Sequence, residues 1–167
     1  FKMVLKAKSP ELNGQSTFLS RRLIFDGVVP CMVPLLGKML VRFNVRGTMG
    51  ECSDSAYMAG KALSYAYECR HVPLLRDIFL KRYSMEESAK VVMSDLTWFA
   101  RSSGATTVDE VLYRIKNETV LVNVNDFGFW LLDVYDLDWV EVRDMFEAIV
   151  LNPHADIVDL PNIIAMH

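Results

Sequence analysis

The chain has 167 residues, enough for one domain with a hydrophobic core of its own. Hydrophobic residues make up 51% of the sequence and the mean hydropathy is +0.18. This surplus predicts apolar surface that packs against other parts of a larger protein. No apolar run of the sequence approaches the roughly 18 residues that a membrane span needs, and its first residues show no signal-peptide pattern.

The net charge of −3 hides a gradient along the chain. Residues 1–50 hold eight lysines and arginines against two acidic residues, and residues 51–100 hold six against seven. Residues 101–167 hold four against twelve. A basic front end of this kind is typical of a polyanion-binding surface, although a solvated strand edge guarded by lysines has the same composition.

Two further features bear on the setting of the chain. It begins at Phe1, without an initiator methionine and within an apolar strand pattern, which we interpret as a segment of a longer protein. Its cysteines are odd in number and widely spaced (Cys31, Cys52 and Cys69), which favours reduced thiols in a cytosolic setting over a disulfide framework or a zinc site.

The first elements predicted are strands. Phe1–Lys8 alternates as a short strand, and Thr17–Phe25 and Val28–Val33 are two β-rich runs separated by Asp26-Gly27. An Asp-Gly pair between such runs favours a tight two-residue hairpin turn. Period-two alternation places Arg21 and Arg22 on opposite faces of the hairpin.

From Pro34 the apolar period becomes helical, with the proline expected in the first turn. Lys38 and Arg42 are four residues apart and share one helix face. A second helix is expected from an Asp54 N-cap to about Cys69, and a third over Pro73–Tyr83.

The remaining helices are predicted from N-capping signals, because a capping side chain satisfies free amides at a helix start. Three capping boxes predict helices over 84–101, 107–116 and 138–151, and Asn125 is expected to cap a helix over 126–134. Residues 152–167 read as an irregular tail. The predicted fold class is mainly α with a small β-element, an N-terminal strand and β-hairpin followed by a bundle of about seven helices.

Catalytic chemistry is not predicted within this segment. Cys69 and His71 are two residues apart at a helix end and would not face each other, so no nucleophilic pair forms. The acidic residues of 126–144 lack the glycine and terminal glutamate of a calcium loop and read as caps and solvated faces. The aromatic residues of 127–139 are interpreted as core.

The order of these elements resembles the carboxy-terminal end of RNA-dependent RNA polymerases of positive-strand RNA viruses. Within this class it is most similar to nodavirus-like and tombusvirus-like polymerases. Phe1-Lys-Met-Val-Leu-Lys is similar to the strand after motif D, and Thr17-Phe-Leu-Ser-Arg-Arg-Leu-Ile-Phe-Asp-Gly to the motif E hairpin, or primer grip. Val33-Pro-Leu-Leu-Gly-Lys-Met-Leu looks like the segment that leads into the thumb. The resemblance implies a palm end and hairpin over 1–33, a helical thumb over 34–151 and a tail over 152–167.

The chain also departs from that family, because it has no Gly-Asp-Asp and no motifs A, B or C. The two-metal centre of such enzymes cannot be built here, so we expect no catalytic or metal-binding residue and no activity from the segment alone. The resemblance implies that Mg²⁺ or Mn²⁺ is held by a palm outside it. It also implies a host-cytoplasmic location in a membrane-associated replication complex, with no membrane contact evident in this segment.

The partners implied by the resemblance are template and product RNA, the palm and fingers of the same replicase, and further replicase copies. The hairpin would hold the 3′ end of the nascent strand, with at most one of the two adjacent arginines as the principal contact. The RNA-binding residues expected are Lys6, Ser20, Arg21, Arg22, Lys38, Arg42 and Arg46. The alternative interpretation is a non-catalytic helical domain that binds a protein partner and whose hairpin is structural.

Overall fold

The structure, a computed structural model, describes residues 17–18, 20–25, 30–47, 52–86, 89–119 and 121–152. Three strands come first in this part of the chain: β1 (Thr17–Phe18), β2 (Arg21–Phe25) and β3 (Pro30–Pro34). The helices that follow are α1 (Leu36–Phe43), α2 (Asp54–Glu68), α3 (Pro73–Ser84), η1 (Met93–Asp95, a 3-10 helix), α4 (Trp98–Arg101), α5 (Val108–Asn117), α6 (Val124–Tyr135) and α7 (Trp139–Val150). The predicted fold class, mainly helical with a small β-element, is confirmed.

The strands form one antiparallel sheet in the order β1-β2-β3. Phe25 pairs with Pro30, so four residues connect β2 to β3, and the two-residue turn predicted at Asp26-Gly27 is wrong. The run predicted as one strand from residue 17 is also interrupted. Ser20 has a φ of 60°, and β1 folds back on β2 at this point. A left-handed serine is uncommon, and here its carbonyl oxygen accepts a hydrogen bond from the Leu35 amide at 3.1 Å.

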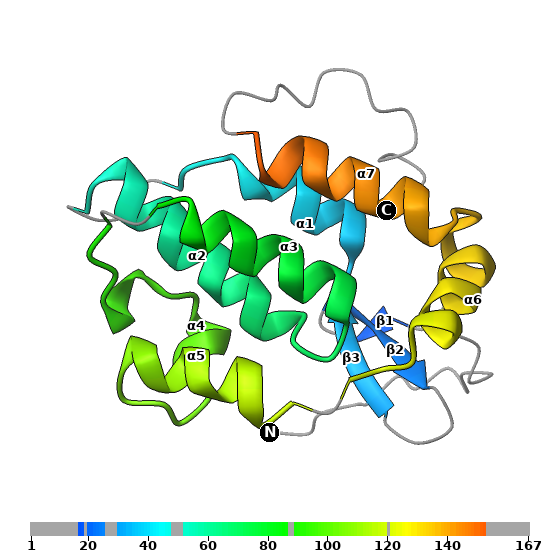
Figure 1. Cartoon of the computed structure of the whole chain (residues 1–167), viewed down its shortest axis with the longest axis horizontal. Helices are drawn as coiled ribbons and strands as arrows, with labels where there is room; N and C mark the ends of the chain where they lie inside the picture. The colour runs from blue at the N-terminus through cyan, green and yellow to red at the C-terminus, as the bar shows by residue number, and fades with distance from the viewer. Residues whose placement is uncertain are drawn as a thin grey trace, which may run out of the picture.

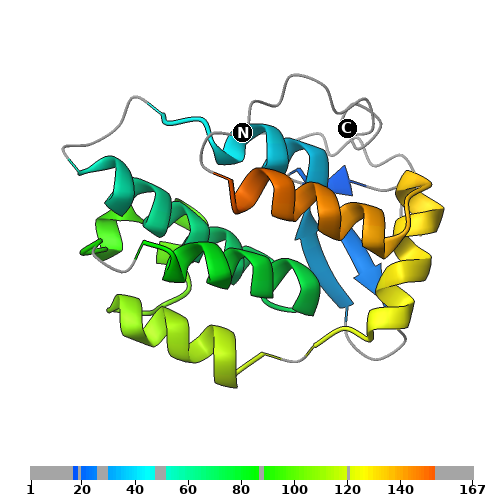
Figure 2. The ribbon, with the colours of Figure 1, turned by 45° about the horizontal axis from the view of Figure 1, so that its top comes forward.

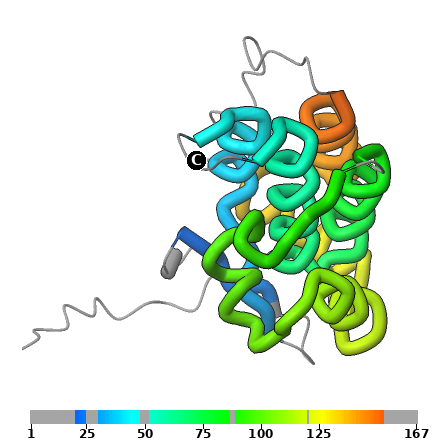
Figure 3. Tube along the Cα trace, turned by 90° about the vertical axis from the view of Figure 1, so that its left-hand side faces the viewer, coloured from blue at the N-terminus to red at the C-terminus, as the bar shows by residue number. Residues whose placement is uncertain are grey.

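The helices lie in three tiers beside the sheet (Figures 1 and 2). α2 and α3 form the middle tier and pack along each other, and α7 lies across α3 and α1 on one side of them. α4 and α5 cover α2 on the other side, which is clearest in Figure 3. α6 stands at the edge of the sheet, where the indole Nε1 of Trp130 donates to the Leu23 carbonyl of β2 at 3.2 Å.

Phe79 of α3 lies at the centre of the hydrophobic core, with 0% of its surface exposed. Its ring lies 5.4 Å from the rings of Phe43 and Tyr65 and 5.9 Å from that of Phe146, measured between centroids. These partners come from α1, α2 and α7, so a single side chain joins four helices. Tilted and edge-to-face pairs at these distances are the arrangement that aromatic rings prefer.

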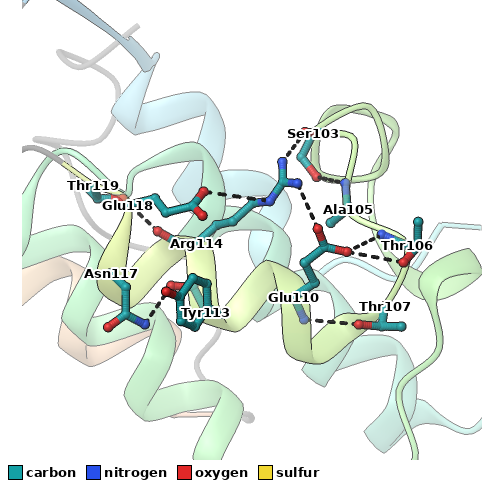
Figure 4. A network of polar contacts seen from close by, with 10 residues as sticks. All are labelled: Ser103, Ala105, Thr106, Thr107, Glu110, Tyr113, Arg114, Asn117, Glu118 and Thr119. Carbon is teal, nitrogen blue, oxygen red and sulfur yellow. Dashed lines mark hydrogen bonds and ion pairs between the residues drawn. The ribbon is translucent and has the colours of Figure 1, made fainter.

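Thr107 and Asp138 cap their helices as predicted, but only Asp138 forms a complete capping box. Thr107 accepts a hydrogen bond from the Glu110 amide at 3.2 Å, and α5 begins at the next residue. The Glu110 carboxylate reaches back to the Thr106 amide at 2.8 Å, and Arg114 then bonds to Glu110 and to the Ser103 carbonyl (Figure 4).

Asp138 opens α7 with a complete capping box. Its carboxylate accepts from the amides of Val140 and Glu141, both at 2.8 Å, and the Glu141 carboxylate accepts from the Asp138 amide at 2.9 Å. This box satisfies three amides at one helix start, as the sequence pattern predicts.

The helix predicted from Ser84 is wrong. Ser84 is the last residue of α3, and its hydroxyl donates to the Lys81 carbonyl at 2.7 Å. The chain then runs through η1 to the short α4. In place of the predicted helix, η1 packs on α2, where Asp95 lies so close to Gly60 that a side chain on residue 60 would overlap it.

Three other helix starts are shifted from the prediction. α6 is capped by Asn123, not Asn125, and its Oδ1 accepts from the Asn125 amide at 2.8 Å. α2 is capped by Ser53, with Asp54 as its first helical residue. Pro34 ends β3 opposite Arg21 and lies outside α1.

Two predicted elements, the strand over 1–8 and nearly all of the tail over 152–167, lie outside the described residues. Among the helices that are described, none combines the length and the apolar character needed to cross a bilayer.

Candidate nucleic-acid interface

A cavity of about 310 Å³ lies where the sheet meets α1, α2 and the start of α4. It gathers four of the predicted RNA-binding residues and several that the sequence did not single out. The lining residues are Ser20, Arg21, Pro34, Leu35, Lys38, Met39, Arg42, Tyr65, Glu68 and Thr97. The β2–β3 hairpin and α1 therefore both contribute basic residues to one cavity.

α1 contributes two cations from its face toward the cavity. Lys38 and Arg42 lie one helical turn apart, as their spacing predicts, and both line the cavity. The Lys38 Nζ donates to the hydroxyl of Ser20 at 2.7 Å, which fixes it beside the turn between β1 and β2. Arg42 is exposed. An exposed guanidinium beside an anchored ammonium is an arrangement that can contact successive phosphates.

Arg21 also lines the cavity but is held by the protein. Its Nη2 donates to Glu68 Oε2 at 2.6 Å, and the two side chains are only 15% and 11% exposed. Its guanidinium carbon lies 4.0 Å from the centre of the Phe99 ring. Arg21 therefore ties β2 to α2 and α4, and much of its charge is balanced by a carboxylate.

Burial raises the pKa of the Glu68 carboxyl above its usual value of 4.5. The Arg21 guanidinium and the Thr97 hydroxyl, which donates to Oε1 at 3.3 Å, lower the same pKa and only partly offset the burial. A close ion pair by itself would depress the pKa of a carboxyl. At this site the loss of hydration outweighs the attraction.

A pH dependence of stability follows from the raised pKa of Glu68. Above the unfolded-state pKa of 4.5 the unfolded chain releases this proton more readily than the folded chain, so the contribution of Glu68 to folding falls as the pH rises. We expect the free energy of unfolding of the wild type, minus that of Glu68→Gln, to decrease from below pH 4.5 to neutrality. Urea unfolding at a series of pH values measures this difference. An increase with pH would show that the attraction of Arg21 outweighs burial.

Tyr65 in the cavity wall and Lys61 near the end of α1 also have shifted pKa values. Burial, with a smaller contribution from Glu68, raises the pKa of Tyr65 to about 12, so the phenol in the cavity wall is neutral. Burial, together with the charge of Arg42, lowers the pKa of Lys61 to about 8. The Lys61 Nζ donates to the carbonyls of Arg42 and Val45 at 2.5 and 2.6 Å, and so caps the C-terminal end of α1.

Arg22 takes no part in this cavity. Its guanidinium carbon lies 5.0 Å from the centre of the Tyr135 ring of α6. The two adjacent arginines contact helices on different sides of the hairpin, as their alternation predicts, and Arg21 is the one on the cavity side.

Arg46 is not brought to the cavity either. Its Nη2 donates to the Cys52 carbonyl at 2.8 Å, it pairs with Asp54, and its guanidinium lies 5.5 Å from the Tyr57 ring centre. It lines a separate cavity of about 460 Å³. Lys6 lies outside the described residues.

Sequence reasoning missed Glu68, Thr97 and Tyr65. Glu68 and Thr97 are 29 residues apart and meet because α4 packs on α2. One signal in the sequence could have indicated the role of Glu68: it is the single acidic residue in the apolar second half of α2.

Among the residues that the structure describes, no group of three or more histidine, cysteine or acidic side chains is placed to hold a metal ion. A scan against family models finds no match for the chain, and searches of curated proteins and of solved structures likewise find nothing similar.

Proposed function

We propose that this chain is the thumb and primer-grip portion of a viral RNA-dependent RNA polymerase. In this proposal it positions template and nascent RNA for nucleotidyl transfer by a palm that lies outside the segment, where Mg²⁺ or Mn²⁺ would be bound. The observation that carries the proposal is the gathering of Ser20, Arg21, Lys38 and Arg42 around one cavity between hairpin and first helix.

The charges around the cavity suit a phosphate backbone. Three cations face a single carboxylate there, and that carboxylate is already engaged by Arg21. Lys38 and Arg42 are left as the two groups that balance phosphate charge, and such contacts set the register of the RNA without reading its sequence. A volume of about 310 Å³ is at the small end for ligand sites and suits one sugar-phosphate unit.

The test is RNA binding by a Lys38→Gln/Arg42→Gln double variant. The ligand is an RNA duplex with a recessed 3′ end, and the measurement is fluorescence anisotropy over a series of salt concentrations. We expect the affinity at low salt to fall at least tenfold, and the slope of log affinity against log salt to lose about two units, because each phosphate contact contributes about 0.9.

The matched control is Lys81→Gln/Lys116→Gln, which removes two exposed lysines from α3 and α5. It changes the net charge by the same amount and touches no residue of the cavity. If both double variants lose affinity equally, the RNA contact is a general effect of charge and the proposal fails.

A non-catalytic domain for binding a protein partner is the second candidate function. It is favoured by a different observation, a helix with large exposed apolar side chains at the opposite end of the described chain. Retained protein binding without any RNA binding would select it.

A further inference from the structure

α6 is apolar on two faces, of which only one is covered. Its inner face holds Phe127, Leu131 and Tyr135, all 5% exposed or less. Its outer face carries Val124, Phe129 and Leu132, exposed by 50%, 69% and 49%. Large apolar side chains that lie together in solvent on one side of a helix are typical of a contact surface, so the outer face of α6 has the composition of such a surface.

The outer face forms one wall of a groove of about 300 Å³. The other wall is the start of α7, with Trp139 exposed by 39%. Gly128 lies at the base, and a side chain there would be 4.0 Å from the Trp139 ring. The groove shares no residue with the basic cavity between the hairpin and α1.

The surroundings of the groove are strongly acidic. Residues 121–152 contain seven aspartates and glutamates and one basic residue, Arg143. Arg143 is bonded to Asp144 at 2.8 Å and lies 5.3 Å from the Trp139 ring centre. Asp126 and Asp133 precede and follow Phe129 by three and four residues, so both flank it on the helix surface. An acidic rim around an apolar floor repels RNA and anionic lipid and favours a cationic partner.

We propose that this groove binds a lysine- or arginine-rich amphipathic helix of a partner protein. The apolar residues of that helix, at helical spacing, would contact Phe129, Leu132 and Trp139, and its cations would lie against the aspartates of the rim. α6 has 12 residues and is about 18 Å long, which matches three turns of a bound helix. The proposal names the partner of the second candidate function and is independent of RNA binding.

The probe for the test is a fluorescent synthetic peptide of leucine and lysine, about 18 residues long, with its leucines at helical spacing. One control peptide has the same composition with strictly alternating leucine and lysine, and the other has glutamate in place of lysine. Anisotropy is measured with the full chain. We expect binding of the helical cationic peptide, at least tenfold weaker binding of the alternating one, and none of the acidic one.

A pair of matched double variants tests whether the probe binds at the groove. Phe129→Ala/Leu132→Ala is expected to weaken binding of the probe at least tenfold, while Trp98→Ala/Tyr113→Ala, which also removes two exposed apolar side chains, leaves it unchanged. Asp133→Lys is expected to weaken it severalfold, more at low salt than at high salt. All of these side chains are exposed, so circular dichroism should report native helix content in each variant.

Three outcomes would overturn the proposal. Equal loss of binding in the groove variant and its control would show that the probe binds nonspecifically. Dimerisation of the chain that Phe129→Ala abolishes, without probe binding, would assign the groove to a second copy. Binding to neutral phosphatidylcholine vesicles, but not to the probe, would assign it to a lipid surface. In each case RNA binding by Lys38 and Arg42 is measured separately and stands or falls on its own result.

Discussion

Truncation of Phe79 to alanine is expected to remove about 4 kcal/mol from the free energy of unfolding, the typical cost of emptying a phenylalanine site in a core. Phe79 is fully buried and contacts one aromatic ring on each of α1, α2 and α7. Those rings are held by three different helices and cannot all close on the cavity. Single-domain proteins have a total stability of about 5–15 kcal/mol, so the variant should be at the margin of folding.

The measurement is urea unfolding followed by circular dichroism, with Tyr113→Ala as the control. Tyr113 is 58% exposed on α5, so its truncation should change the stability by less than about 0.5 kcal/mol. Phe79→Leu fills part of the site and is expected to fall between the two. If Phe79→Ala costs no more than Tyr113→Ala, the four helices do not share the core described here.

Gly60→Ala is expected to destabilise the chain by about 2 kcal/mol, although alanine is the better helix former by about 1 kcal/mol. A Cβ on residue 60 would lie 2.7 Å from the carbonyl oxygen of Asp95 and 3.1 Å from its carbonyl carbon. Both are backbone atoms, so no side-chain rotation relieves the overlap. The segment from η1 to Thr97 would have to move off α2, and with it the hydrogen bond of 2.9 Å from the Thr97 amide to Ser64.

Gly128→Ala is the matched control, since it makes the same change in the middle of another helix. The nearest atom to its Cβ is Trp139 Cδ1 at 4.0 Å, an ordinary contact distance. With no overlap, the gain in helix propensity remains, and we expect about 0.5–1 kcal/mol of added stability. Thermal unfolding measures the change in stability of both variants, which we expect to be a loss for Gly60→Ala and a gain for Gly128→Ala. Equal shifts in the same direction would mean that the approach of Asp95 to α2 does not constrain the fold.

Helix starts were predictable where the signal and its effect lie within one turn. Thr107 and Asp138 each cap the helix that their sequence pattern predicts, because every hydrogen-bond partner in these caps lies within four residues. Ser84 carries the same signal and ends a helix instead. The segment after Ser84 instead packs on α2 through contacts such as that of Asp95 with Gly60, which joins residues 35 positions apart and which no local pattern around Ser84 predicts.

In the candidate site, too, the features that depend on local periodicity were predictable, and those that depend on tertiary contacts were not. The shared face of Lys38 and Arg42 and the opposite faces of the two hairpin arginines follow from the periods of helix and strand. Which arginine faces the cavity depends on where α2 lies, and the carboxylate that engages Arg21 comes from 47 residues further along the chain. Arg46 follows the same basic run in the sequence, but its pairing with Asp54 places it at another cavity.

The hydrogen bond from Trp130 to β2 gives the molecule an optical reporter of its own. Of the three tryptophans in the chain, Trp98 and Trp139 are exposed, and Trp130 is half-buried with its indole nitrogen on the Leu23 carbonyl. Iodide or acrylamide in solution therefore quenches the emission of the first two while sparing the third. The unquenched emission reports the hairpin, while the quenchable emission comes from Trp98 on α4 and Trp139 at the groove together. In a Trp98→Phe variant the quenchable emission comes from Trp139, so events at the hairpin and at the groove on α6 can be followed separately in one sample without a label.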